Sequence, residues 1–122
     1  MNKWRVLLEY IDYYVYSKED EQIQIQEGTE KEMAESLYKQ FVQTHDISGD
    51  DLWAFDISLD CLRKMSKKDR NYLAEHTDYN DYHFGYAMYI RNNYIHGSKK
   101  RFVLMADDTS FQVMEYMFSI LS

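Results

Sequence analysis

Arg91 and His96 are the two residues of this sequence whose types and spacing could together carry out chemistry. A histidine can take up or release a proton near neutral pH, and an arginine can hold a phosphate throughout a reaction. Cleavage of RNA by attack of the 2′-hydroxyl needs those two roles and no metal. The two residues stand five positions apart where a helix is predicted to end, so both side chains could point into one cleft. The pattern is typical of a metal-independent ribonuclease with His96 as general acid/base and Arg91 on the scissile phosphate.

The run from Ile90 to Gly97 reads Ile-Arg-Asn-Asn-Tyr-Ile-His-Gly. Its spacing, with the polar Asn92 after the arginine, is similar to that of the HEPN ribonucleases, which are helical bundles found in toxins and phage-defence systems. This similarity covers eight residues, and it implies RNA as a partner and a homodimer in which the motifs of two chains meet. The competing interpretation is a helix C-terminus with a cation near its negative end and a basic loop after it (Lys99, Lys100, Arg101).

A second pattern extends over residues 58–118. It contains Leu59-Asp60, then His83 and Gly85, then Ile90-Arg91-Asn92, and it closes with Asp107, Asp108 and Ser110. The ordered combination resembles a family of small, mainly helical bacterial domains of unknown function, so the resemblance implies a helical fold and no particular activity. The chain departs from the family pattern at Tyr94-Ile95-His96, where tryptophan and glycine are more frequent, and at Ala106, where proline is more frequent.

The physical interpretation of this hallmark is structural. Gly85 would permit a close helix crossing, and Arg91 and Asn92 would satisfy backbone carbonyls at a helix end. Asp107 and Asp108 stand where acidic residues favour a helix N-terminus. A pairing of Arg91 with one of these two aspartates is therefore the structural alternative to a catalytic Arg91. We assign His83, Gly85, Arg91, Asn92, Asp107 and Asp108 to this structural hallmark.

The charge of the 122-residue chain is −7, and it is unevenly distributed. Residues 9–60 carry fourteen acidic and three basic residues, a net charge of −11, whereas residues 61–106 carry four acidic and nine basic residues, a net charge of +5. The acidic half would repel nucleic acid, while the basic half could contact phosphate. The charges favour either two solvated helix faces or an acidic half that meets a basic partner protein.

Tyrosine is unusually frequent, with twelve in the chain, and several lie among acidic residues near the N-terminus. Tyrosine offers a large apolar area with a polar tip, and it is enriched where proteins bind proteins. Charge would steer a basic partner to this surface and the aromatic rings would anchor it. The alternative is that most tyrosines fill the core. The residues predicted to bind a partner are Tyr10, Asp12, Tyr13, Tyr14, Tyr16, Glu19, Asp20 and Glu21.

No metal or cofactor site is expected. His76 and His83 are seven positions apart, and the sequence has neither a His-x-x-x-His pair nor a cysteine pair. The four glycines are too widely spaced for a phosphate-binding loop, and Cys61 is expected in the core. The lone cysteine fits a reducing cytosol. Glu9 and Asp12 interrupt the first apolar run too soon for a signal peptide, and no segment predicts a membrane span, so we expect a cytoplasmic protein.

The fold predicted from the sequence is mainly α: a single compact helical domain over residues 1–122, with a short N-terminal β-hairpin as an open alternative to helix. The sequence has no proline, which favours long helices. Residues 1–45 form an acidic hairpin or helix region, and residues 48–122 form a helical bundle. Helix starts are predicted at Thr29 with Glu32, at Ser48, at Ser66 with Asp69, and at Asp108 or Thr109. Residues 79–95 are predicted to form one central helix.

Three hypotheses follow. The preferred one is a non-enzymatic inhibitor or immunity-type protein that neutralises a basic partner acting on nucleic acids. The alternative is the ribonuclease with Arg91 and His96, and the third is an accessory domain with a purely structural role. Arg91 and His96 facing an open basic cleft would favour the enzyme, whereas Arg91 buried against Asp107 or Asp108 would favour the binding protein.

Overall fold

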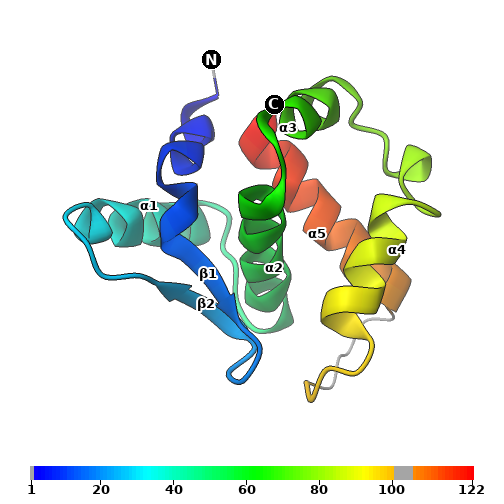
Figure 1. Ribbon diagram of the computed structural model, residues 1–122, viewed down its shortest axis with the longest axis horizontal. Coiled ribbons are helices and arrows are strands. Elements are labelled where there is room, and N and C mark those ends of the chain that lie inside the picture. Colours follow the sequence, from blue (N-terminus) through cyan, green and yellow to red (C-terminus); the bar gives the residue numbers. More distant parts are fainter. Residues whose placement is uncertain (1, 101–105) are drawn as a thin grey trace.

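Helix α2 (Asp50–Lys64) occupies the centre of the molecule, and every residue from Trp53 to Leu62 is buried (Figure 1). The computed structural model describes residues 2–100 and 106–122. Helix α5 crosses α2, while the N-terminal segment, the hairpin and α1 pack on the other side of α2 from α4. This confirms the mainly α-helical fold with a short N-terminal hairpin. The elements are η1 (Lys3–Tyr13), β1 (Tyr14–Ser17), β2 (Gln22–Ile25), α1 (Lys31–Thr44), α2, α3 (Lys67–Glu75), η2 (Tyr79–Asp81), α4 (Tyr86–Ile90), η3 (Arg91–Ile95) and α5 (Ala106–Leu121).

The N-terminal segment contains both structures that the sequence left open. It begins as the 3-10 helix η1, in which the Asn2 side chain accepts a hydrogen bond from the backbone N–H of Trp4 at 3.0 Å. Leu7 and Ile11 of η1 are buried. From Tyr14 the chain becomes extended, and β1 pairs antiparallel with β2. The hairpin therefore begins only after eleven residues of helix, because the apolar residues before Tyr14 pack as one face of a helix.

Helix α1 begins later than predicted, and the expected capping pair of Thr29 and Glu32 does not form. Its N-cap residue is Glu30, which makes no hydrogen bond through its side chain to the helix. Thr29 lies one position too early to accept from the first turn. The helix ends at Thr44. Phe41 of this helix stacks on Phe55 of α2, with ring centroids 4.6 Å apart, and so joins α1 to the core.

Helix α3 begins as predicted, since the Ser66 hydroxyl accepts a hydrogen bond from the backbone N–H of Asp69 at 3.1 Å. The single central helix predicted over residues 79–95 is wrong. This segment divides into the 3-10 turn η2, the short helix α4 and the π-helical turn η3. Asp78 caps η2 through the N–H of Asn80, and Gly85 has non-helical dihedral angles just before α4. These two local features interrupt the helix although the tyrosines of this segment have helical spacing.

Helix α5 begins at Ala106, so Asp107 and Asp108 belong to its first turn and the predicted start at Asp108 or Thr109 is too late. Five of its apolar residues are buried as the spacing predicted: Val113, Met114, Met117, Phe118 and Leu121. Within the described residues, no helix combines the length and the apolar character needed to cross a membrane.

Candidate functional site

Arg91 is buried at the junction of α4 with α5, where its guanidinium contacts four groups of the chain. One Nη donates to the Tyr79 and Ser110 hydroxyls at 3.2 and 3.1 Å, and the other donates to the His83 carbonyl at 2.7 Å. Its Nε lies 3.4 Å from an Asp107 carboxylate oxygen. The predicted pairing with one of the two aspartates is therefore found, at Asp107. Arg91 ties the 79–85 segment to the first turn of α5.

The other hallmark residues have different surroundings. His83 contributes its carbonyl to Arg91, while Asn92 and Asp108 are exposed. Gly85 does not serve a close helix crossing as we expected, because a Cβ atom at this position would lie 3.9 Å from its nearest neighbour, the Tyr82 carbonyl oxygen. The space at Gly85 is therefore sufficient for a side chain.

His96 is exposed and lines a different part of the surface from Arg91. It borders a polar groove of about 320 Å³ between the hairpin turn and η3, whose other lining residues include Tyr16, Lys18 and Glu21. The Arg91 side chain does not line this groove. In the π-helical turn, the backbone N–H of His96 donates to the Arg91 carbonyl at 2.7 Å, and the two side chains diverge into separate environments. The expected shared cleft is thus not formed. Arg101 of the predicted basic loop lies outside the described residues.

Two buried aspartates on α2 form a site that we did not predict. Asp56 accepts hydrogen bonds from the Tyr38 hydroxyl and, at 3.2 Å, from the backbone N–H of Ile23 in β2. Asp60 accepts from the backbone N–H of Tyr16 in β1 at 3.3 Å and from the Tyr94 hydroxyl at 2.6 Å. The hairpin is therefore seated on α2 through one carboxylate per strand. The signal in the sequence was a pair of acidic residues four positions apart within an apolar helical segment.

The two carboxylates have opposite pKa shifts. Burial raises the pKa of Asp56 to about 6, although hydrogen bonds from Tyr38 and Ile23 act to lower it. Burial also acts to raise the pKa of Asp60, but hydrogen bonds from Tyr94 and Lys64 stabilise its carboxylate and lower the pKa below its usual value. Asp60 is therefore a charged anchor with basic neighbours, including Arg63 at 3.0 Å.

The tyrosines predicted to bind a partner are mostly committed to the interior. Tyr14 is 0% exposed and donates to the Ala34 carbonyl at 2.7 Å, so we correct its assignment from the partner surface to the core. Tyr16 is half-buried and accepts from the Trp53 indole N–H at 2.7 Å. Tyr10 and Tyr13 are half-buried against the core. These rings were needed to fill a small domain.

The predicted acidic residues of the same set lie at the surface. Asp12, Glu19 and Asp20 are exposed. Glu21 is half-buried because its carboxylate accepts from the Ser98 hydroxyl and from the backbone N–H of Lys99, both at 2.7 Å. Glu21 thus connects the hairpin turn to the loop after η3, and Asp12, Glu19 and Asp20 remain accessible to a partner.

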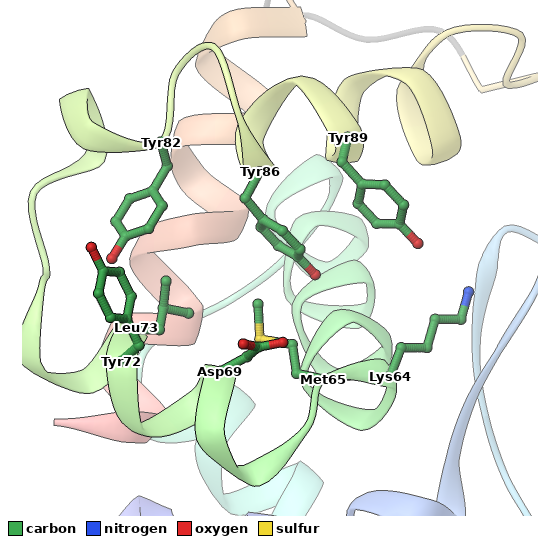
Figure 2. A pocket seen from close by; sticks show the side chains of 8 residues that line it. All are labelled: Lys64, Met65, Asp69, Tyr72, Leu73, Tyr82, Tyr86 and Tyr89. Atoms are coloured by element: carbon green, nitrogen blue, oxygen red, sulfur yellow. The ribbon is translucent and has the colours of Figure 1, made fainter.

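A pocket of about 340 Å³ opens between α3 and α4, beside the end of α2. Figure 2 shows the side chains of Tyr82 and Tyr86 projecting toward α3 and that of Tyr89 on the Lys64 side, while Tyr72 and Asp69 project from α3 into the pocket. Tyr72 is 56% exposed and Tyr89 is 40% exposed. The four rings give the pocket an aromatic lining, and Asp69 supplies a carboxylate. The single helix predicted over residues 79–95 did not indicate this pocket.

Cys61 is fully buried in the core. Burial raises the pKa of the Cys61 thiol to about 12, so it remains protonated at neutral pH and is not a nucleophile. No group of three or more histidine, cysteine or acidic side chains among the described residues could hold a metal ion.

Comparisons with known proteins gave no match among family models, curated proteins or solved structures. The two resemblances noted from the sequence, to HEPN ribonucleases and to a bacterial domain family, therefore stay predictions.

Proposed function

We propose that this chain is a non-enzymatic binding module whose acidic N-terminal surface takes a basic protein, most concretely as an inhibitor or immunity-type protein for a partner that acts on nucleic acids. The observation that carries the proposal is a set of exposed acidic side chains with few bases to balance them. They lie on η1, the hairpin turn, the loop before α1 and the start of α1: Glu9, Asp12, Glu19, Asp20, Glu27, Glu30 and Glu32.

Local packing brings acidic residues from separate segments together. The backbone N–H of Gln26 donates to the Tyr13 carbonyl at 3.0 Å, and the Tyr13 ring lies against Gly28. A Cβ atom at Gly28 would approach this ring to 3.0 Å, so the close contact favours glycine. Asp12 at the end of η1 is consequently near Glu27 and the start of α1.

The bases within this half leave most of its charge uncompensated. Lys31 pairs with Glu27 at 2.6 Å and with Glu35 at 3.5 Å. Lys18 and Lys39 are exposed and contribute the only other positive side chains of residues 9–60. An accessible surface of this charge would accelerate the encounter with a basic protein and would make binding sensitive to salt.

The ribonuclease hypothesis receives less support from the geometry. A phosphate-binding arginine must be able to reach substrate, whereas the Arg91 guanidinium already contacts Tyr79, His83, Asp107 and Ser110. His96 faces a groove that Arg91 does not line. Metal-independent RNA cleavage would therefore have to use a different cation or a rearranged loop.

The proposal is tested by using the protein as bait in lysate of its own host, beside two triple variants. The first variant, Asp12→Asn with Glu19→Gln and Glu30→Gln, removes three negative charges from the acidic N-terminal surface. The second, Glu75→Gln with Asp81→Asn and Glu115→Gln, removes the same charge from exposed positions elsewhere. We expect a basic, nucleic-acid-acting protein to be retained by the native chain and the second variant and lost by the first.

Retention that is the same for both variants would contradict the proposal, as would a retained protein of acidic character. A parallel assay of RNA cleavage without metal, with native protein and His96→Ala, addresses the alternative. Cleavage that disappears in His96→Ala would overturn the binding-module proposal in favour of the ribonuclease.

A further inference from the structure

We propose that the tyrosine-lined pocket between α3 and α4 binds an organic cation, an alkylated ammonium group, through the faces of its rings and the Asp69 carboxylate. The pocket is separate from the acidic N-terminal surface, and the inference does not depend on the proposed function. Its volume of about 340 Å³ lies near the lower end for small-ligand sites, and it suits a compact group.

The walls of the pocket are aromatic on two sides. Tyr82, Tyr86 and Tyr89 line one side and Tyr72 the other, with Met65 and Leu73 at the base (Figure 2). Aromatic faces carry partial negative charge and attract cations, most strongly when the cation is poorly hydrated, as alkylated ammonium groups are. Ordered rings lose little conformational entropy on binding such a group, because tyrosine has few rotatable bonds.

Two of the four tyrosine hydroxyl groups around the pocket are engaged with other groups of the chain. The Tyr82 hydroxyl donates to the His76 carbonyl, and the Tyr86 hydroxyl lies in hydrogen-bonding contact with the Cys61 thiol. Tyr86 and Tyr89 also stack on each other, with ring centroids 5.4 Å apart. These contacts hold the rings in place, so that their faces rather than their hydroxyl tips are available to a ligand.

One ammonium group and one carboxylate line the pocket, and their pairing within the chain differs. Lys64 stands at the edge, but its ammonium lies 3.2 Å from an Asp60 oxygen and 5.3 Å from the centroid of the Tyr94 ring. Lys64 shares the Asp60 carboxylate with Arg63, so its positive charge is partly offset within the chain. The Asp69 carboxylate makes no ion pair with any basic side chain of the described residues, while its backbone N–H is satisfied by Ser66. Asp69 is therefore the carboxylate of the pocket lining that can pair with a bound cation.

The probe we would use is tetramethylammonium chloride, titrated into protein with ¹³C-labelled tyrosine rings and followed by NMR. Sodium chloride is exchanged for the probe at constant ionic strength, and tert-butanol serves as the neutral probe of similar shape. We expect saturable shifts of the four pocket tyrosines with tetramethylammonium and much weaker ones with tert-butanol. Asp69→Asn should weaken binding about tenfold, the effect of removing one charge-assisted contact.

Two further variants test the contribution of one ring and provide a control for the loss of an acidic residue. Tyr72→Leu removes one exposed ring and should weaken binding at least about threefold, as expected for a single cation–ring contact. Glu115→Gln removes an exposed acid from α5 and should leave the affinity unchanged. Equal affinity for tert-butanol and tetramethylammonium would overturn the inference and make the pocket a site for neutral apolar groups. Unchanged affinity in a folded Asp69→Asn variant would also overturn it.

The source of the cation is distinguished by a second pair of probes. A short peptide that contains one trimethylated lysine presents the group on a protein chain, whereas choline presents it as a free small molecule. Tighter binding of the peptide would assign the pocket to a modified protein side chain, and tighter binding of choline would assign it to a free quaternary ammonium ligand. Failure of both, together with tetramethylammonium, would contradict the inference.

Discussion

The two sides of α2 use tyrosine in different ways. On the hairpin side, Tyr14 is fully buried, and Tyr16 accepts from the Trp53 indole N–H. On the α3–α4 side, Tyr72 and Tyr89 leave about half of their surface uncovered and border an open pocket. The same residue type therefore builds the core in one region and a surface pocket in the other.

The tyrosine rings differ in exposure because different elements pack against them on the two sides of α2. The hairpin covers its tyrosines because its backbone N–H groups are fixed on α2 by Asp56 and Asp60. The segment above α3 is interrupted at Gly85, and α4 is only five residues long. Neither α3 nor α4 covers the rings of Tyr72 and Tyr89, which remain partly exposed in the pocket between these helices. The number of tyrosines in a sequence therefore does not by itself indicate a binding surface. It must also be known which helix or strand packs over them.

The largest expected effect on stability comes from removing the Asp60 carboxylate, which holds the hairpin on α2. Asp60→Ala would leave the Tyr16 N–H and the Tyr94 hydroxyl without an acceptor, and the neighbouring Arg63 and Lys64 without a counter-charge. We expect the free energy of unfolding to fall by about 3 kcal/mol, measured by urea denaturation. Asp12→Ala, at an exposed position, should change it by less than about 0.5 kcal/mol. If the free energy of unfolding of Asp60→Ala fell by less than about 1 kcal/mol, the result would contradict the role of this carboxylate in holding the hairpin on α2.

The second largest effect on stability is expected at Arg91, which joins the segment before α4 to α5. Arg91→Met would leave the His83 carbonyl without its donor and would remove the ion pair with Asp107, and we expect a loss of about 2 kcal/mol in the free energy of unfolding. His96→Ala should be within about 0.5 kcal/mol of the native value, because His96 is exposed. Thermal unfolding of the two variants measures the contrast, and equal effects would show that the residues do not differ in role.

The pH dependence of stability separates the two aspartates. The folded-state pKa of Asp56 is raised to about 6, so its contribution is full below the unfolded-state pKa of about 4 and is lost as pH rises through 6. Between pH 7 and pH 5, Asp56 should therefore add about 1 kcal/mol to the free energy of unfolding. Asp60, whose pKa is lowered, should lose its contribution only as pH falls below about 4.

Urea denaturation at pH 7 and pH 5 measures this effect in native protein and in Asp56→Asn. The other titrating groups are common to both proteins, so the difference between them isolates Asp56. We expect the variant to gain about 1 kcal/mol less than the native protein on going from pH 7 to pH 5. An identical gain in both proteins would contradict the raised pKa of Asp56.

The smallest effect compares one hydroxyl from each side. Tyr14→Phe removes a buried hydrogen bond to the Ala34 carbonyl and should cost about 1 kcal/mol. Tyr72→Phe removes an exposed hydroxyl and should leave the free energy of unfolding within about 0.3 kcal/mol of the native value. Chemical denaturation at one pH suffices for both. A cost for Tyr72→Phe as large as that for Tyr14→Phe would show that its ring is part of the core.

The sequence by itself determined the local features. Apolar spacing placed α2 and α5, Ser66 and Asp69 marked the start of α3, and the acidic pair at Asp107 and Asp108 indicated a partner for Arg91. These features depend on neighbours within a few residues or on a charge that needs a counter-charge. For that reason they can be recognised in a single chain.

Only the tertiary structure decided where the remaining side chains lie. It broke the expected helix over residues 79–95, moved Tyr14 into the core, separated Arg91 from His96 and brought Asp56 and Asp60 under the hairpin. Each of these outcomes depends on a segment many positions away that covers, or fails to cover, the residue. Burial and its effect on pKa are properties of that contact between distant segments, and no periodicity along the chain records them.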